Sequence, residues 1–305
     1  MSAQTGLTPL LGVRDLRKTY ATRGGLLGRR TGEVRAIDGI SFEVMPREIL
    51  GLVGESGSGK STTGRVVLRL EEPTSGAVSF DGNVITGLPQ LEMKRYRREM
   101  QVVFQDPYAA LNPRMTVGAF VAEPLIVHGL APNRSEREEK VAALFKQVGL
   151  DPRFMARYPH EFSGGQRQRV NIARAIAMRP RLIVADEPIT ALDVSIQAQI
   201  VNLFQDLQQE LGMAYLFIAH DLSMVRYLCH RVAVMLRGRI VEIAPTEAIF
   251  TDARHAYTRS LLSAIPVPKP AIERLRRPIA FDYETEKPSP EATLQEVSPG
   301  HFVLT

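Results

Sequence analysis

The stretch "EILGLVGESGSGKSTTGRVVLRL", residues 48–70, decides the fold of this chain. An apolar run typical of a buried strand leads into a glycine-rich loop, and a helical pattern follows. The loop fits G-x-x-x-x-G-K-[ST], with Gly54, Gly59, Lys60 and Ser61 in the fixed positions. In this context backbone N–H groups close on phosphate oxygens, and the helix N-terminus adds positive potential. The stretch therefore predicts a phosphate-binding loop; the alternative is a glycine-rich turn that fits by chance.

The side chains of the loop predict how a nucleotide is held. We expect the Lys60 ammonium to reach the β- and γ-phosphates and the Ser61 hydroxyl to bind Mg²⁺. The loop residues predicted to contact the nucleotide are Gly54, Glu55, Ser56, Gly57, Ser58, Gly59, Lys60, Ser61 and Thr62.

Three further apolar runs predict a parallel sheet beside this loop. They are "QVVFQ" (101–105), "RLIVADE" (181–187) and "AYLFIAH" (214–220). Nearly unbroken apolar runs suit parallel strands that are buried on both faces. Helical patterns separate the runs, as at residues 195–212, where Gly212 is a plausible stop. Strands that alternate with helices indicate an α/β core.

Polar side chains lie at or just past the carboxyl ends of these runs. Because open α/β sheets bind ligands at this edge, we expect Gln105, Asp186, Glu187 and His220 to converge there with Gly54. Adjacent carboxylates at the end of a buried strand are costly unless a cation or partner compensates them. The alternatives are an acidic pair held in a salt bridge and a structural or surface histidine.

This placement predicts a role for each side chain. Asp186 would serve Mg²⁺, and Glu187 would polarise the attacking water. His220 would donate a hydrogen bond to the γ-phosphate, and Gln105 would sense the metal or the water.

A second phosphate-binding pattern lies in "HEFSGGQRQRV", residues 160–170. Ser163, Gly164 and Gly165 precede a helical run, so they leave N–H groups accessible at a helix start. Arg167 and Arg169 add positive potential. The alternative is an ordinary serine N-cap.

The remaining chain predicts two additions to the core. Short, turn-bounded strand patterns at residues 10–50 and 77–82 indicate an antiparallel sheet. Residues 111–180 are mostly helical in pattern, with a serine cap expected at Ser135, and indicate a helical subdomain inserted into the core. After about residue 265 the chain is proline-rich and polar, typical of a tail with little core of its own.

Composition restricts the compartment and the partners. The net charge of +5 and pI of about 9.4 suit nucleic acid, a nucleotide or an anionic membrane surface. Cys229 is the only cysteine, which excludes intrachain disulfides and favours a reducing cytosol. We see no signal peptide and no apolar run of the length that a membrane helix needs, so another chain would span any membrane.

The motifs taken together resemble the ATP-binding subunit of an ABC transporter over residues 8–265. "GESGSGKST", "FSGGQ", "LIVADEP", "ALD" and "AHD" appear in the family order. The resemblance implies an α/β P-loop NTPase (RecA-like) core with an antiparallel β subdomain and an inserted α-helical subdomain, at about 111–180. It also implies ATP and Mg²⁺, and two cassettes that pair head to tail. ATP is then clamped between the phosphate loop of one cassette and the SGGQ helix of the other.

The resemblance also implies roles for single residues. The signature residues Ser163, Gly164, Gly165 and Gln166 contact the partner's nucleotide, and Tyr20 stacks on adenine. Asp193 matches the loop between the protomers. The catalytic residues implied are Lys60, Gln105, Glu187 and His220, and the metal ligands are Ser61, Gln105 and Asp186.

Longer stretches resemble the oligopeptide/dipeptide importer subfamily, notably "FQDPYAALNPRMTVG" and "HAYTRSLLSAIPVP". This implies an ABC domain at 8–250 and a C-terminal extension with a proline-rich tail at 251–305. The partners implied are a second ATPase subunit, identical or different, two transmembrane permease subunits and, indirectly, an extracytoplasmic solute-binding protein. The location implied is the cytoplasmic face of the plasma (inner) membrane, as a peripheral subunit.

The sequence leaves the cargo open and allows other classes of nucleotide-binding protein. The cargo could be peptides, nickel, glutathione or opines. A soluble ABC ATPase acting on nucleic acid or ribosomes fits the basic pI, but this chain has one cassette and only about 125 residues between the phosphate loop and the acidic strand. The SGGQ helix argues against a kinase, and no N-K-x-D motif supports a GTPase. We therefore expect no nucleic-acid partner.

Residues 107–118 are the candidate permease contact, with the basic cluster "KRYRRE" (94–99) as a solvated face or a second contact.

Overall fold

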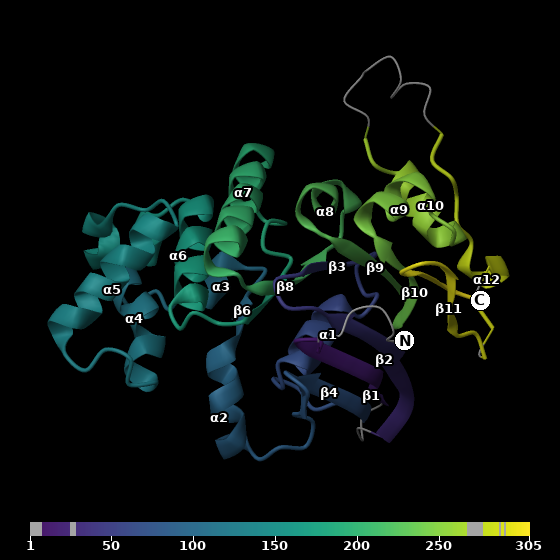
Figure 1. Ribbon diagram of the computed structural model, residues 1–305, viewed down its shortest axis with the longest axis horizontal. Coiled ribbons are helices and arrows are strands. Elements are labelled where there is room, and N and C mark those ends of the chain that lie inside the picture. Colours follow the sequence, from purple (N-terminus) through teal and green to yellow (C-terminus); the bar gives the residue numbers. More distant parts are fainter. Residues whose placement is uncertain (1–7, 25–28, 267–276, 287, 290) are drawn as a thin grey trace. The chain divides into compact units, whose positions relative to one another are not determined.

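The computed structural model describes residues 8–24, 29–266, 277–286, 288–289 and 291–305 (Figure 1). The chain divides into two units, of which the first comprises Met1–Gly87 with Phe217–Thr305 and the second Leu88–Leu216. Among the described helices, none is both long and apolar enough to cross a membrane.

The first unit contains the predicted antiparallel sheet. Its strands are β1 (Leu11–Gly24), β2 (Arg29–Val44), β4 (Ser75–Phe80) and β5 (Asn83–Val84), paired in the order β2-β1-β4-β5. Alternate side chains of β1 and β2, such as Val13, Phe42 and Val44, are buried, as the half-apolar pattern predicted.

The first unit also contains part of the parallel sheet. Strand β3 (Ile49–Val53) is buried at every residue and pairs in parallel with β9 (Arg231–Leu236). Strand β10 (Arg239–Pro245) turns back antiparallel to β9 through Arg237 and Gly238, both with positive φ. This hairpin was not predicted, because Arg-Gly is not among the pairs, such as Asn-Gly or Asp-Gly, that mark a two-residue turn.

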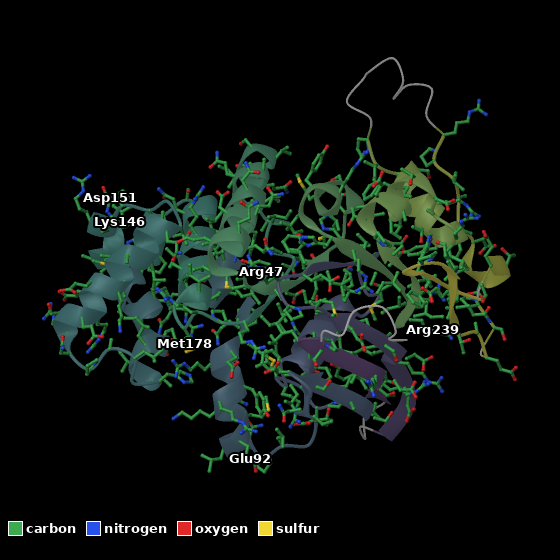
Figure 2. All side chains as sticks on the ribbon, viewed as in Figure 1. Arg47, Glu92, Lys146, Asp151, Met178 and Arg239 are labelled. Carbon is green, nitrogen blue, oxygen red and sulfur yellow. The ribbon has the colours of Figure 1, made fainter. Side chains whose placement is uncertain are left out.

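Helices α1 (Lys60–Val67), α8 (Leu222–Leu228), α9 (Thr246–Thr251) and α10 (Ala256–Ser263) complete this unit together with a C-terminal segment. That segment holds α12 (Tyr283–Glu286), β11 (Leu294–Ser298) and β12 (His301–Leu304). Strand β12 pairs with β10, and Arg239 bonds the carbonyls of Ser289 and Ala292 (Figure 2).

The expectation of a tail with little core is therefore wrong for β12, where His301, Val303 and Leu304 are buried, whereas β11 is mostly exposed. His301 is 1% exposed, and its Nε2 lies 2.7 Å from the equally buried Glu242.

The second unit contains the helical region and two parallel strands. Strands β6 (Met100–Val103) and β7 (Leu182–Asp186) pair in parallel from Met100 opposite Leu182 to Val103 opposite Ala185. Its remaining elements are α2 (Gln90–Glu99), α3 (Pro107–Ala110), α4 (Val117–Val127), α5 (Arg134–Gln147), the 3-10 turns η1 (Pro152–Ala156) and η2 (Pro159–Glu161), α6 (Gly164–Ile176) and α7 (Val194–Leu211). Strand β8 (Ala214–Ala219) carries the chain from the second unit back to the first.

Residues 104–181 contain helices and turns without a strand, as predicted, with α4, α5 and α6 gathered together (Figure 1). Two details differ from the sequence expectation. Helix α5 begins two residues earlier than expected, because Asn133 rather than Ser135 accepts the capping hydrogen bond. Strand β6 ends at Val103, and Phe104 is exposed. The expected domain division at residue 250 stays a prediction.

Candidate functional site

The phosphate loop in the first unit joins β3 to α1 through glycines with positive φ. Gly59 has φ 104°, and a Cβ there would lie 2.1 Å from the carbonyl oxygen of Ala36. Gly57 also has positive φ, but a Cβ there would meet no atom within 4 Å. The loop is thus closely packed at its base and open at its tip, a shape that leaves room for an oxygen-rich ligand above the backbone.

Lys60 bonds the backbone of its own loop. Its side chain is 3% exposed, and its ammonium donates to the carbonyl oxygens of Gly54 at 2.8 Å and Glu55 at 2.9 Å. A buried ammonium needs acceptors or a counter-charge. Phosphate oxygens can supply both, so the predicted role of Lys60 fits its position.

The turn between β9 and β10 is hydrogen-bonded to the phosphate loop. Gly238 donates its N–H to the Ser58 carbonyl at 2.9 Å, and its own carbonyl accepts from Asp38 N. Met235 lies so close to Gly54 that a Cβ at Gly54 would stand 2.1 Å from the Met235 carbonyl oxygen. The unpredicted hairpin therefore helps fix the conformation of the predicted loop.

Tyr20 lies on β1 beside the helix that follows the loop. Its ring is 37% exposed, with the Lys18 ammonium 5.0 Å from the centroid, and its hydroxyl donates to Glu71. Burial, followed by the hydrogen bond to Glu71, raises the pKa of Tyr20, while a hydrogen bond with Thr62 of α1 opposes this. An exposed aromatic ring next to Thr62 fits the stacking role, which stays a prediction.

His220 follows β8 and is exposed, in keeping with its expected place at a strand end. The next residue, Asp221, caps α8 by accepting from Ser223 N at 2.8 Å. The cap fixes the direction in which the chain leaves the strand. The role of His220 in hydrolysis stays a prediction.

In the second unit, the two acids and the glutamine are brought together as expected. Asp186 ends β7 and is 8% exposed, and Glu187 follows with φ 46°. Positive φ is unusual for a residue other than glycine and concentrates at functional sites. Gln105 donates its Nε2 to the Glu187 carboxylate at 2.9 Å, which leaves the Gln105 amide oxygen directed elsewhere.

The second phosphate motif forms the start of α6. Ser163 is the N-cap: its Oγ accepts from Gln166 N at 3.4 Å, and the Gln166 side chain accepts from Ser163 N at 3.0 Å. This reciprocal arrangement is a capping box. Ser163 is exposed, so the cap faces solvent in the described chain.

The two arginines after this motif donate to backbone carbonyls. Arg167 is 7% exposed, donates to the Pro159 carbonyl and stacks on Tyr108. Arg169 donates to the Val148 carbonyl. Their side chains therefore hold segments of the helical region together. Their contribution of positive potential at the helix start stays a prediction.

Gln168 is a residue that sequence reasoning missed. It is fully buried, and its amide donates to the Pro188 carbonyl at 2.8 Å. This bond joins the signature helix to the loop directly after Glu187. A polar residue on the buried face of an otherwise amphipathic helix was the only signal for it.

A known protein family matches the segment of the chain that carries these motifs. The family model described as "ABC transporter" matches residues 37–190. This chain belongs to the ABC transporter family. Residues 241–290 of this ABC protein match a second model, "Oligopeptide/dipeptide transporter, C-terminal region". The resemblance inferred from the motifs is confirmed.

Two curated relatives share half of their aligned residues with this ABC protein. The glutathione import ATP-binding protein GsiA of Salmonella paratyphi A (strain ATCC 9150 / SARB42) is 50% identical over 301 residues, which cover 97% of this chain and 48% of the relative. GsiA of Escherichia coli (strain K12) is 50% identical over 304 residues, with the same coverage of 97% and 48%. The chain therefore spans about half the length of the curated relatives it matches.

Solved structures confirm the predicted fold of an ABC cassette. The ATP-binding cassette MJ0796, in a dimeric post-hydrolysis state bound to ADP and Pi, is 30% identical with a TM-score of 0.67, covering 77% of this chain and 98% of that one. CbiO1 from Clostridium perfringens, part of the ABC transporter complex cbiONQ, is 26% identical with a TM-score of 0.68, covering 88% and 98%.

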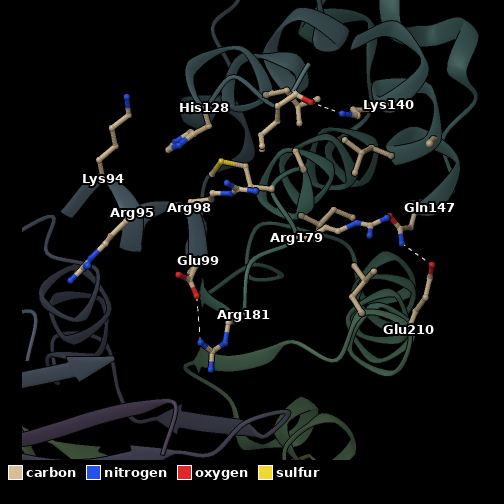
Figure 3. Close-up of a pocket in the computed structure, with 18 of the residues that line it drawn as sticks. Lys94, Arg95, Arg98, Glu99, His128, Lys140, Gln147, Arg179, Arg181 and Glu210 are labelled. Carbon is tan, nitrogen blue, oxygen red and sulfur yellow. Dashed lines mark hydrogen bonds and ion pairs between the residues drawn. The ribbon is translucent and has the colours of Figure 1, made fainter. Parts of the chain in front are cut away.

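The second unit of this ABC protein also has a basic pocket of about 1050 Å³ (Figure 3). Its apolar lining residues include Leu125 of α4, Leu144 of α5 and Ile176 of α6. Its basic lining residues are Lys94, Arg95, Arg98, Lys140, Arg179 and Arg181, and its acidic ones are Glu99 and Glu210.

The acids in this pocket already have partners. Figure 3 shows Glu99 turned toward Arg181, at 3.4 Å, and Gln147 toward Glu210, at 2.8 Å. Over the part of the chain that the structure describes, no ion pair involves Lys94, Arg98 or Arg179. Burial, and then Lys94 and Arg98, lower the pKa of His128. The pocket therefore has an excess of positive charge that an anionic group would relieve.

Proposed function

We propose that this chain is the ATP-hydrolysing subunit of an ABC importer for peptides or similar small solutes. The observation that carries the proposal is the Gln105–Glu187 hydrogen bond, which orients a carboxylate at the end of a buried strand. Together with the Lys60 loop, this supplies phosphate binding and a base for water, the two requirements of phosphoryl transfer.

The chemistry proposed is transfer of the γ-phosphoryl group of ATP to water. Lys60 exchanges the Gly54 and Glu55 carbonyls for phosphate oxygens and so neutralises charge on the γ-phosphate. As the water oxygen bonds to the γ-phosphorus, the Glu187 carboxylate takes the proton of that water. The bond from the γ-phosphorus to the β–γ bridging oxygen breaks, and ADP leaves with that oxygen. His220 is proposed to donate a hydrogen bond to the γ-phosphate.

Mg²⁺ fits the donor set proposed for it. The Ser61 hydroxyl, the Gln105 amide oxygen and the Asp186 carboxylate are all hard oxygen ligands. Asp186 is nearly buried, a position in which a carboxylate favours a cation. When bound, Mg²⁺ would neutralise charge on the β- and γ-phosphates.

A second cassette is the partner proposed for the Ser163 helix. Its capped, exposed start can receive a phosphate from outside the chain, and MJ0796 was solved as a dimer. The partner cassette can be a second copy or a different chain. Equilibrium sedimentation with and without ATP tests this pairing, and a chain that stays monomeric with ATP and every candidate cassette contradicts it.

Two permease subunits are the membrane partners proposed, with the basic pocket and residues 107–118 as the contact. An acidic segment of a permease would match the excess charge at Lys94, Arg98 and Arg179. The chain would then sit peripherally on the cytoplasmic face of the plasma (inner) membrane, with an extracytoplasmic solute-binding protein delivering cargo to the permease. Co-purification of the tagged chain with two membrane subunits from detergent-solubilised membranes tests this assignment.

The cargo proposed is a peptide or a peptide-like solute. The match of residues 241–290 and the name of the GsiA relatives support this class, and glutathione is itself a short peptide. Nickel complexes and opines are the alternatives. Uptake of labelled glutathione and dipeptides by cells with and without the chain distinguishes these cargoes, and uptake unaffected by its loss contradicts the peptide class.

The central test is Glu187→Gln. We expect ATP binding to persist, while phosphate release slows by roughly 10²–10⁴-fold, because an amide cannot take the proton of the water. Glu210→Gln is a matched control: Glu210 also accepts a hydrogen bond from a glutamine, at 2.8 Å, but outside the site. Near-normal turnover in Glu187→Gln, or none in the wild-type chain paired with its cassette, contradicts the proposal.

A further inference from the structure

Tyr257, in the C-terminal extension, contacts the phosphate loop directly. It is the second residue of α10 and is 2% exposed. Its hydroxyl oxygen accepts a hydrogen bond from the backbone N–H of Glu55 at 3.0 Å. Both residues lie in the first unit, although 202 positions separate them.

The contact falls on the peptide group that also holds Lys60. The N–H of Glu55 and the C=O of Gly54 belong to one peptide unit, and the described chain contains no cis peptide bond. In a trans peptide these two groups point in opposite directions from a rigid plane. Tyr257 therefore anchors one end of the plane, while the Lys60 ammonium bonds the other end at 2.8 Å.

Tyr257 is itself held by several buried contacts. Its ring packs edge-on against Phe281, with centroids 5.3 Å apart, and its N–H donates to His255 Nδ1 at 3.1 Å. The buried carboxylate of Glu242 accepts from the N–H groups of Arg254 and His255 and contacts His301 of the C-terminal hairpin. The hydroxyl is thus placed by contacts with described residues of the C-terminal extension and of β10.

We propose that Tyr257 is a positioning residue for ATP binding, and that the C-terminal extension sets the geometry of the phosphate loop through it. This inference rests on the proposed function. With Tyr257 in place, the Gly54–Glu55 peptide keeps its orientation when Lys60 moves its hydrogen bonds to the phosphates. Without the hydroxyl, the peptide can rotate, because Gly54 has no side chain to restrict rotation about its Cα–C bond.

The state of the hydroxyl is compatible with this role. Burial raises the pKa of Tyr257 to about 12, so the group stays protonated and neutral at physiological pH. A neutral hydroxyl accepts the Glu55 N–H and places no negative charge beside the phosphate loop.

The experiment compares Tyr257→Phe with Tyr215→Phe. Tyr215 is a matched control because it is 1% exposed and its hydroxyl has no hydrogen-bond partner in the described structure. Loss of one net hydrogen bond predicts that the Kd and KM for Mg·ATP rise by about 2- to 12-fold in Tyr257→Phe. The kcat should stay within about twofold, since the Tyr257 hydroxyl contacts the loop backbone and no reacting atom. Tyr215→Phe should change none of these values.

The readouts separate positioning from simple loss of stability. A purely structural role for Tyr257 would lower the melting temperature and leave the KM of the folded protein unchanged, and that result overturns the inference. Equal KM values for Tyr257→Phe and Tyr215→Phe also overturn it, while leaving ATP hydrolysis by the wild-type chain in place. A wild-type chain that neither binds nor hydrolyses ATP overturns both the inference and the proposed function.

Discussion

The two helix starts that resemble phosphate sites are built in opposite ways. Helix α1 begins after Gly59, which makes no side-chain cap, and the loop before it is closed by the buried ammonium of Lys60. Helix α6 begins after Ser163, whose side chain and that of Gln166 cap each other's backbone N–H. The first start lacks an internal cap and carries its own positive charge; the second is capped, exposed and without a directed cation.

The two helix starts can therefore form different halves of a nucleotide site. At α1, phosphate oxygens would replace the Gly54 and Glu55 carbonyls as acceptors for the Lys60 ammonium. At α6 a phosphate must share or displace the Ser163 hydroxyl at the Gln166 N–H, which is favourable only when other contacts bring the phosphate there. A second cassette that already holds ATP would supply those contacts. The predictions below test this asymmetry.

The largest effect is expected at α1. Lys60→Ala should reduce ATP binding by the single chain, and turnover with it, by at least about 100-fold, because a directed charge on the phosphates is lost. Binding of a fluorescent ATP analogue and release of phosphate measure the two effects. Lys146→Ala, an exposed lysine on α5, is the control. Binding by Lys60→Ala within tenfold of wild type would remove the asymmetry.

A different pattern is expected at α6. Ser163→Arg should leave ATP binding by the single chain unchanged but weaken ATP-dependent dimerisation by on the order of 30-fold or more, because a bulky side chain then fills the contact. Sedimentation with ATP, in the Glu187→Gln background, measures it. Ser163→Asn keeps an N-cap acceptor and is the control. Mixed dimers with one altered cassette should retain one half-site, and full dimerisation of Ser163→Arg would contradict the two-cassette assignment.

The smallest effect is expected on stability, at the two glycines that begin α6. A Cβ at Gly165 would lie 2.5 Å from Ile196 Cγ2, whereas one at Gly164 would lie 3.4 Å from its nearest neighbour. Gly165→Ala should therefore destabilise the fold by about 1–3 kcal/mol through overpacking. Gly164→Ala should be neutral or stabilising by up to about 1 kcal/mol, since alanine favours the helix. Urea unfolding of both variants measures the difference, and equal midpoints would mean that Gly165 is not packed against α7.

The sequence predicted those elements whose signal is local. The apolar runs became β3, β6, β7 and β8, and Gly212 ends α7 with φ 68°. The approach of Gln105 to Glu187 also followed, because both come after parallel strands. In each case a short pattern and one general rule of sheets sufficed.

The missed features depend on contacts between distant segments. The directions of Arg167 and Arg169 follow from which carbonyls lie nearby, Pro159 and Val148, and an arginine after a glycine-rich motif gives no sign of this. The burial of His301 depends on Glu242, 59 residues away. A polar, proline-rich composition conceals a hairpin whose few buried side chains have their partners in another part of the sheet.

By itself, the order of residues determined that this protein has an α/β core with a phosphate loop, a signature helix and an acidic strand end, because glycine conformations, caps and apolar runs act over a few residues. The contact of Tyr257 with the Glu55 peptide and the bonds of Arg167 and Arg169 to the Pro159 and Val148 carbonyls depend on how the chain packs. A hydrogen bond between segments 200 residues apart exists only once packing has brought them together.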